Sequence, residues 1–250
     1  MTTVRAPAKL TRSLRIVGVR ADGYHLLDAE MVTLDLADTL TFGPGDGLTV
    51  SGPAADDIPV DDTNLVRRAL RALQRTARVH VDKRIPHGAG LGGGSADAAA
   101  VLRWAGCHDV AVAARLGADV PFCLVGGRAR VRGIGEQVEA LAPIDAAFTM
   151  CTPPFGVSTP QVYARWDALG GPTADGPNDL EPAALAVEPR LARWRDRLGA
   201  AAGRQPVLAG SGSTWFVDGA FPEIAERLRP AIVVVTRTDR PEGGPSGRPA

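Results

Sequence analysis

The sequence has few of the residues that mark secreted, metal-binding and membrane proteins. Its 250 residues include only three cysteines, too few and too widely spaced for a disulfide framework or a zinc site (Cys107, Cys123 and Cys151). No pair among its four histidines has the i, i+4 spacing of a helical metal site. It lacks both the apolar run of roughly 18 residues that a membrane helix needs and the apolar segment of a signal peptide. We therefore expect a cytoplasmic protein with free thiols and no membrane partner.

Neither sign of charge is in excess. The 28 lysines and arginines balance the 28 aspartates and glutamates, so the formal net charge is zero. Nucleic-acid binding depends on neutralising phosphates with excess basic residues, and we expect no nucleic-acid partner.

Lysine itself is rare, because all basic residues except Lys9 and Lys83 are arginines. A lysine in such a chain indicates a position that requires a compact ammonium group.

Proline and glycine interrupt the chain throughout, as in proteins that join helices and strands through many turns. Short apolar runs predict strands at residues 14–19, 31–36, 79–81, 129–131, 146–150, 207–209, 215–217 and 232–235. Apolar residues at helical spacing predict helices at residues 64–75, 96–104, 109–116, 191–198 and 221–228. We place a boundary between two lobes near Pro143, and we expect a disordered tail from Asp239 onward.

A dense glycine run is the strongest local signal. Residues 88–94 contain five glycines, and Ser95 and an alanine-rich helix follow directly. Without Cβ atoms in the way, the backbone N–H groups of such a run can converge on one anion. The following helix adds the positive end of its dipole, which suits a nucleotide phosphate. The Ser95 hydroxyl is placed to bind phosphate or a phosphate-bound magnesium ion.

Three other structures also contain glycine-rich runs. This run could be a flexible turn, although a turn rarely needs so many glycines before a strong helix. A P-loop would end in Gly-Lys-Ser or Gly-Lys-Thr, which is missing. The dinucleotide-binding spacing Gly-x-Gly-x-x-Gly occurs at residues 88–93. However, residues 83–86 separate it from the preceding strand, and no clear second strand leads to Asp109, where the acidic residue is expected.

A fourth interpretation comes from a resemblance. Residues 86–99, Pro-His-Gly-Ala-Gly-Leu-Gly-Gly-Gly-Ser-Ala-Asp-Ala-Ala, resemble the phosphate loop of the GHMP kinases, the family of galactokinase and the homoserine, mevalonate and phosphomevalonate kinases. Residues 83–86 resemble the branch that acts on a cytidine diphosphate alcohol. Further segments resemble that branch in the same order, namely residues 6–9, 18–25, 62–65, 116–122, 157–163, 178–182 and 209–213. Each segment alone is weak, but their shared order makes the resemblance strong.

The resemblance implies a two-lobed α+β fold of mixed and antiparallel sheets with helices, and an active site in the cleft between the lobes. The N-terminal lobe would span residues 1–142 with the phosphate loop at 86–96, the C-terminal lobe residues 143–238, and the tail residues 239–250. It also implies an enzyme that uses ATP and Mg²⁺. The implied reaction is phosphorylation of the 2-hydroxyl of 4-diphosphocytidyl-2-C-methyl-D-erythritol, a step in non-mevalonate isoprenoid precursor synthesis.

The resemblance also assigns site residues. It places Lys9 and Asp119 in catalysis, where Asp119 would accept or orient the hydroxyl proton while paired with Lys9. The alternative for Asp119 is an ordinary helix N-cap. The implied nucleotide-binding residues are Asn64, Leu65, Pro86, Gly88, Gly90, Leu91, Gly92, Gly93, Gly94, Ser95 and Ala96. Ser95 would also reach the magnesium ion that ATP brings. The implied substrate-binding residues are Thr11, Tyr24, His25, Thr159, Tyr163, Gly210 and Gly212.

The two tyrosines of the chain, Tyr24 and Tyr163, both fall in segments where the family places aromatic rings against cytosine. Stacking of this kind contributes roughly 1–3 kcal/mol per base, and the resemblance implies that His25 binds the base edge. The alternatives are a half-buried strand tyrosine and a helix-face tyrosine with no ligand.

Some features depart from the family pattern. Thr11 stands where the family usually has asparagine, and several connecting segments are shorter. Two other functions therefore stay open: a GHMP-type kinase with a different small-molecule substrate, and a nucleotide-binding pseudokinase without turnover. ATP consumption with a panel of cytidine diphosphate alcohols separates the three.

Overall fold

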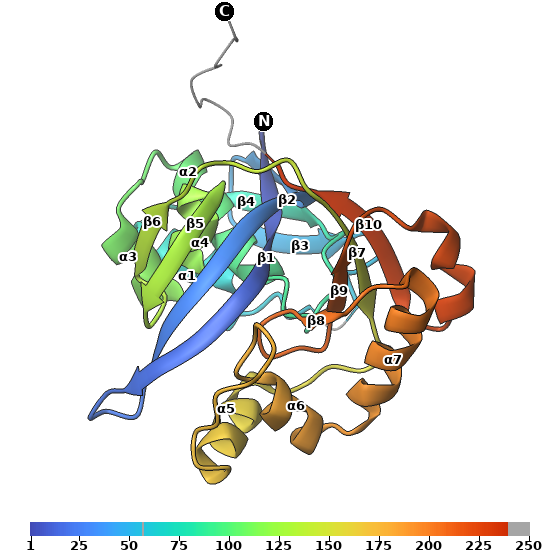
Figure 1. Cartoon of the computed structure of the whole chain (residues 1–250). Helices are drawn as coiled ribbons and strands as arrows, with labels where there is room; N and C mark the ends of the chain where they lie inside the picture. The colour runs from blue at the N-terminus through green and yellow to red at the C-terminus, as the bar shows by residue number, and fades with distance from the viewer. Residues whose placement is uncertain (57, 240–250) are drawn as a thin grey trace, which may run out of the picture.

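Two β-sheets form the framework of the molecule (Figure 1). The computed structural model describes residues 1–56 and 58–239. The larger sheet is made of β1 (Thr2–Val19), β2 (His25–Gly43), β3 (Gly47–Ser51), β4 (Arg78–Asp82), β5 (Arg128–Gly133) and β6 (Gln137–Ala140). Its order is β3-β4-β2-β5-β6 with β1 paired to β2; the β3–β4 pair is parallel and the other pairs are antiparallel.

The smaller sheet is antiparallel throughout and has the order β10-β7-β9-β8. Its strands are β7 (Ala147–Thr152), β8 (Val207–Leu208), β9 (Trp215–Asp218) and β10 (Ile232–Arg237). The predicted α+β fold of mixed and antiparallel sheets is confirmed.

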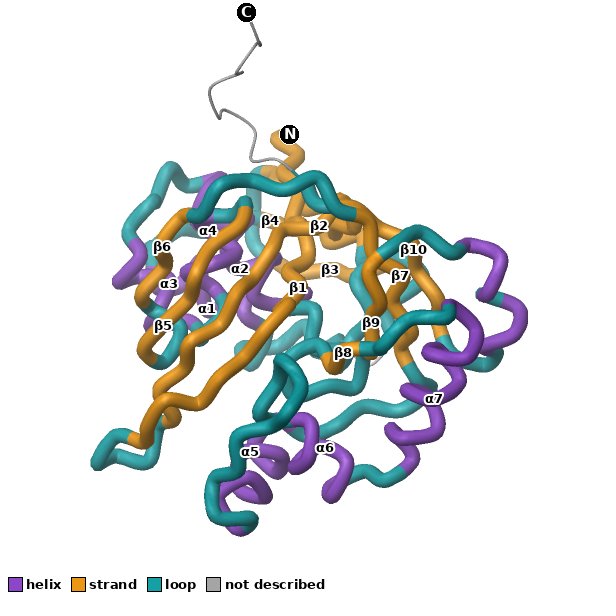
Figure 2. The backbone as a smooth tube through the Cα atoms, in the orientation of Figure 1, coloured by secondary structure: helices purple, strands orange, loops and turns teal. Residues whose placement is uncertain are grey.

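Seven helices of the described chain divide between the sheets (Figure 2). Beside the larger sheet lie α1 (Leu65–Ala72), α2 (Gly93–Trp104), α3 (Val110–Leu116) and α4 (Val120–Val125). Toward the smaller sheet lie α5 (Thr159–Ala168), α6 (Glu181–Val187) and α7 (Arg190–Ala202). Helix α2 is the central one, since residues 96–102 are all buried. Its many alanines let the helix backbone come close to the sheet.

A long hairpin of β1 and β2 runs through the larger sheet and projects beyond it (Figure 2). Its turn is closed by the N–H of Arg20, which donates to the Tyr24 carbonyl at 2.8 Å, and by Gly23 at φ +86°. The register shifts between Pro7 and Lys9. Such irregularities redirect side chains, and this one falls beside the first lysine of the chain.

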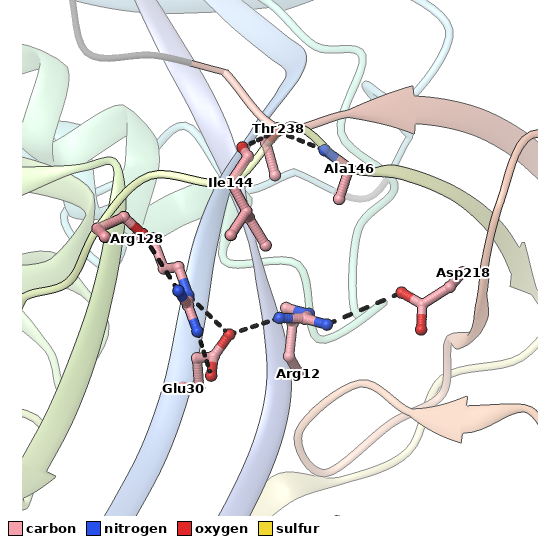
Figure 3. Close-up of polar contacts among 8 residues, drawn as sticks. Arg12, Glu30, Arg128, Ile144, Ala146, Asp218 and Thr238 are labelled. Atoms are coloured by element: carbon pink, nitrogen blue, oxygen red, sulfur yellow. Dashed lines mark hydrogen bonds and ion pairs between the residues drawn. The ribbon is translucent and has the colours of Figure 1, made fainter.

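The sheets are joined by ion pairs centred on Arg12 of β1 (Figure 3). Its guanidinium donates to Glu30 of β2 at 2.6 Å and lies 4.0 Å from Asp218 of β9. Arg128 of β5 donates to the same Glu30 carboxylate at 3.0 Å. These contacts link the strand that carries Lys9 to the smaller sheet.

Most predicted elements are present, with some differences. Each predicted strand overlaps an observed strand, but the helix predicted from Ala96 begins at Gly93. The helix predicted at 221–228 is wrong: this segment forms two short 3₁₀ turns, Pro222–Ile224 and Glu226–Leu228. A segment this short gains few α-helical hydrogen bonds, and 3₁₀ turns are common in short pieces of chain. The elements β3, β6, α4, α5 and α6 were not predicted, because they are short or largely exposed.

The predicted C-terminal tail does not begin at Asp239. Asp239 was assigned to a disordered tail, but its N–H donates to Thr33 at 2.8 Å and its carboxylate pairs with Arg5 at 2.9 Å. The rest of that tail, 240–250, lies outside the described residues.

Within the residues that are described, no helix is long and apolar enough to cross a membrane. The division of the lobes near Pro143 remains a prediction; it falls between β6 and β7.

Candidate active site

The glycine run lines a cavity of about 350 Å³, which we call the nucleotide cavity. Its walls contain every predicted nucleotide-binding residue except Ala96, together with Ile58, Pro59, Thr63, Lys83, Ile85, His87, Ala89 and Asp97. Ala96 does not fit the prediction, because its side chain is fully buried and its N–H already donates to Gly92. Asn64 reaches the cavity, but its side chain also caps α1 by accepting the Val66 N–H at 2.8 Å.

The loop ends at the N-terminus of α2. Gly92 is the N-cap and has a left-handed φ of +70°, which glycine adopts without strain. Because the helix begins at Gly93, the N–H groups of Gly93 and Ser95 lie in its first turn and have no partner within the helix. These free donors and the helix dipole favour an anion in the cavity.

Lys9 and Asp119 meet at the edge of this loop. The Lys9 Nζ lies 3.4 Å from Asp119 Oδ2 and donates to Thr11 Oγ1 at 3.0 Å. Lys9 is only 5% exposed, and its backbone N–H donates to the Leu91 carbonyl. Asp119 does occupy the N-cap position of α4, but its side chain makes no capping hydrogen bond. The carboxylate faces Lys9 instead, so the ordinary N-cap interpretation does not account for its orientation.

A second glycine segment closes over the first. A Cβ atom on Gly90 would lie 2.7 Å from the Ala209 carbonyl oxygen and 2.9 Å from that of Gly212, so the two backbones touch. Gly210 lies beside Lys9, since a Cβ atom there would be 3.8 Å from Nζ. Of the two predicted substrate residues in this segment, Gly210 thus lies beside Lys9, and Gly212 lies against Gly90 of the loop.

Four of the predicted substrate residues gather in a second cavity of about 450 Å³, which we call the base cavity, whereas Thr11 lies at Lys9. Tyr24, His25, Thr159 and Tyr163 all line it. Tyr24 is 59% exposed at the end of the hairpin, whereas Tyr163 on α5 packs on the His25 ring with centroids 4.8 Å apart. Burial raises the pKa of the Tyr163 hydroxyl, which keeps it neutral. Two aromatic residues from distant segments therefore share one cavity.

His25 lines the cavity and has partners that the prediction did not include. Its Nε2 lies 2.8 Å from Asp167 Oδ1, and its ring packs edge-on against Trp166. Only Nδ1 is left to contact a base edge. Asp167 was not among the predicted site residues, because nothing in its sequence surroundings links it to His25.

Sequence reasoning also missed a buried ion cluster behind the loop. Lys83 Nζ lies 2.5 Å from Asp38 Oδ2 and 2.7 Å from Asp97 Oδ2. Asp38 Oδ1 accepts the N–H groups of Arg84 and Ile85. The cluster thereby ties strand β2, the entry to the loop and helix α2 together. The one feature of the sequence that could have indicated a special role for Lys83 is the rarity of lysine in the chain.

Burial raises the pKa of the Asp97 carboxyl to about 7, against the opposing effect of the Lys83 ammonium group. Two carboxylates share one ammonium group here, so one of them tends to retain a proton.

The described residues include no group of three or more His, Cys, Asp or Glu side chains that could hold a metal. Magnesium in nucleotide sites keeps several waters and is held mainly by phosphates and one or two protein oxygens. The Ser95 hydroxyl in the first turn of α2 fits a metal that enters with a nucleotide.

Comparisons with known proteins agree with this geometry. The protein-family model for the GHMP kinases N terminal domain matches residues 64–127, which include the glycine loop and Asp119. A solved structure described as mevalonate kinase aligns with a TM-score of 0.59 at 12% identity, covering 95% of this chain and 99% of that one. At that identity the likeness shows the fold alone. The glycine loop, the Lys9–Asp119 pair and this fold define a kinase of the GHMP class.

More similar proteins narrow the class. A protein of Paracoccus denitrificans named 4-diphosphocytidyl-2-C-methyl-D-erythritol kinase is 41% identical, covering 88% of this chain and 87% of its own length. One from Cereibacter sphaeroides with the same name is 38% identical over 93% of this chain and 94% of its length. A crystal structure of 4-(cytidine 5'-diphospho)-2C-methyl-D-erythritol kinase aligns with a TM-score of 0.73 at 33% identity, covering 96% of this chain and all of that one. The chain belongs to the family of 4-diphosphocytidyl-2-C-methyl-D-erythritol kinases.

Proposed function

We propose that the protein transfers the γ-phosphoryl group of ATP to the 2-hydroxyl of 4-diphosphocytidyl-2-C-methyl-D-erythritol. One observation carries the proposal: the Lys9–Asp119 pair lies between residues that line the two cavities. Lys9 contacts the loop that lines the nucleotide cavity, and Asp119 directly follows Ala118, which lines the base cavity. A phosphoryl donor and an alcohol acceptor held in these cavities would meet at this pair.

The residues of the chain divide the chemical work. The N–H groups at the start of α2 hold the nucleotide phosphates, and Lys9 offsets the charge that develops during transfer. Asp119 orients the substrate hydroxyl and takes its proton. Since phosphoryl-transfer transition states are largely dissociative, positioning by Asp119 contributes more than deprotonation. Magnesium, held by the phosphates and Ser95, would supply further charge neutralisation.

Substrate recognition relies on the base cavity. Tyr24 and Tyr163 would enclose the cytosine ring, His25 would offer Nδ1 to its edge, and Thr159 lines the same cavity. Thr11, in place of the family's usual asparagine, keeps Lys9 in position through the hydrogen bond to its Nζ.

The division of the chain into an N-terminal lobe at 1–142 and a C-terminal lobe at 143–238 is part of this proposal. A cytoplasmic location is a further part, supported by cysteines that are all free thiols (Cys107, Cys123 and Cys151).

The test is ATP consumption by the purified protein across a panel of cytidine diphosphate alcohols. We expect turnover with 4-diphosphocytidyl-2-C-methyl-D-erythritol to exceed that with every other alcohol. Preference for a different alcohol would indicate a GHMP kinase with another substrate. ATP binding without consumption for any alcohol would indicate a pseudokinase and contradict the proposal.

A further inference from the structure

We propose that Arg115 binds the diphosphate of the substrate and thereby makes the base cavity selective for a nucleoside diphosphate over a nucleoside. This inference rests on the proposed function, since it concerns the same cavity. Arg115 lies in the last turn of α3, four residues before Asp119. It is the only lysine or arginine among the residues that line the base cavity.

The imidazole and carboxylate groups that line this cavity already have partners. His25 is paired with Asp167 at 2.8 Å, and the Glu136 carboxylate accepts the Ile134 N–H at 2.6 Å. Asp119, next to the cavity wall, faces Lys9. The guanidinium of Arg115 makes no hydrogen bond or ion pair with any residue in the described ranges 1–56 and 58–239.

Nearby arginines behave differently. On the hairpin that borders the cavity, Arg20 pairs with Asp22, and Arg15 pairs with Asp179 at 2.6 Å. Further along β1, Arg12 pairs with Glu30. Arg115 is thus the cation beside the substrate that remains available to a ligand.

The charge of the substrate requires such a cation. A diphosphate is a dianion or close to it, whereas the cavity presents the Glu136 carboxylate and adjoins Asp119. Without Arg115, the substrate would bring like charges together. A guanidinium binds phosphate oxygens through two parallel N–H groups, which favours arginine over a point charge.

The position along the chain also fits. The wall of the cavity includes Arg115, Gly117 and Ala118, and Asp119 follows Ala118 in the chain. In the substrate, the diphosphate lies between the cytidine and the alcohol that reacts. With cytosine between the tyrosines and the alcohol at Asp119, the middle of the molecule passes along this wall.

If Arg115 only stabilises the fold, its replacement should have a different effect. A cation in the last turn of α3 can stabilise the helix through its dipole alone. In that case its removal would lower the melting temperature and change all ligand affinities alike.

The experiment measures the affinities of CDP and cytidine by calorimetry for the wild type, Arg115→Ala and Arg115→Lys. Arg165→Ala is the matched control, because Arg165 on α5, the helix that contributes Tyr163 to the cavity, is exposed and does not line the cavity. We expect Arg115→Ala to weaken CDP binding about tenfold or more, as for a lost charge-assisted hydrogen bond. Cytidine binding should change less than about twofold, Arg115→Lys should recover part of the loss, and Arg165→Ala should match the wild type.

The outcomes separate the two claims. If cytidine binds the wild type but Arg115→Ala weakens CDP and cytidine equally, or weakens neither, the assignment of Arg115 is wrong while the base cavity stands. If neither CDP nor cytidine binds the wild type, the proposed function fails and the inference fails with it. Added salt should reduce the preference for CDP in the wild type and leave it unchanged in Arg115→Ala.

Discussion

A Cβ atom on Gly92 would lie 2.8 Å from Cγ of Lys9, although the two residues are 83 positions apart. The loop that lines the nucleotide cavity therefore packs directly on the lysine of the active site. Only a residue without a side chain allows this approach, and Gly92 also has a left-handed φ of +70°.

Gly92→Ala should consequently reduce turnover at least about tenfold, because the methyl group displaces Lys9 as well as straining the backbone. Gly106→Ala is the matched control. Gly106 has nearly the same φ, +71°, lies outside both cavities, and has no atom beyond its chain neighbours within 4 Å of the position of its Cβ. Both variants should lose roughly 1–2 kcal/mol of stability from the left-handed conformation, and only Gly92→Ala should lose turnover on this scale. Equal losses of turnover in the two variants would show that contact with Lys9 is unimportant.

Replacing either member of the Lys9–Asp119 pair should remove most of the activity. We expect Asp119→Asn and Lys9→Ala each to lower kcat at least about 100-fold, as for the loss of a positioned catalytic group. ATP affinity should change far less in Asp119→Asn. Asp109→Asn serves as the control, because Asp109 caps α3 through a hydrogen bond to the Ala111 N–H, and asparagine caps equally well. Near-normal kcat in Asp119→Asn would remove this residue from the mechanism.

The two tyrosines should affect substrate binding and stability differently. Tyr24→Ala and Tyr163→Ala should each raise the substrate KM about tenfold through lost stacking, with the ATP KM nearly unchanged. Tyr24 is 59% exposed, so its removal should leave the melting temperature unaltered, whereas Tyr163 packs on His25 and its removal should lower it. The account of the base cavity does not survive if both variants keep the wild-type substrate KM.

The buried ion cluster should make stability depend on pH. The pKa of Asp97 is about 7 in the folded protein against an ordinary value of 3.8, so the folded state holds a proton that the unfolded state releases. This contribution is complete below the ordinary pKa and is lost as the pH rises through about 7. Lys83 and Asp38 face the same carboxyl. As the pH rises from about 5 to about 8, the melting temperature of Asp97→Asn should therefore fall less than that of the wild type. Parallel curves for the two proteins would contradict a raised pKa for Asp97.

The sequence predicted features whose cause lies within one short segment. It predicted contacts between distant segments only where those segments resemble motifs of a known family. The glycine density before Ser95 predicted the anion-binding loop, because its cause lies within one short segment. The resemblance, not the pattern of residues, brought Lys9 and Asp119 together across the fold.

The missed features depend on tertiary partners. Nothing near His25 in the sequence indicates that Asp167 will occupy its Nε2. Likewise, Asp38 and Asp97 look like ordinary polar residues until the fold encloses them with Lys83. The segment at residues 222–228 has an apolar pattern of helical spacing, but it is short and forms two 3₁₀ turns instead of an α-helix.

The most direct test of the central claim is to identify the phosphorylated atom. The purified protein is incubated with ATP, magnesium and 4-diphosphocytidyl-2-C-methyl-D-erythritol, and the product is analysed by phosphorus–carbon and phosphorus–proton NMR couplings, with Asp119→Asn as the inactive control. The account predicts a new phosphate monoester on the 2-hydroxyl of the methylerythritol unit, formed by the wild type alone. A phosphate on another hydroxyl, or ATP consumed without any phosphorylated alcohol, would contradict it.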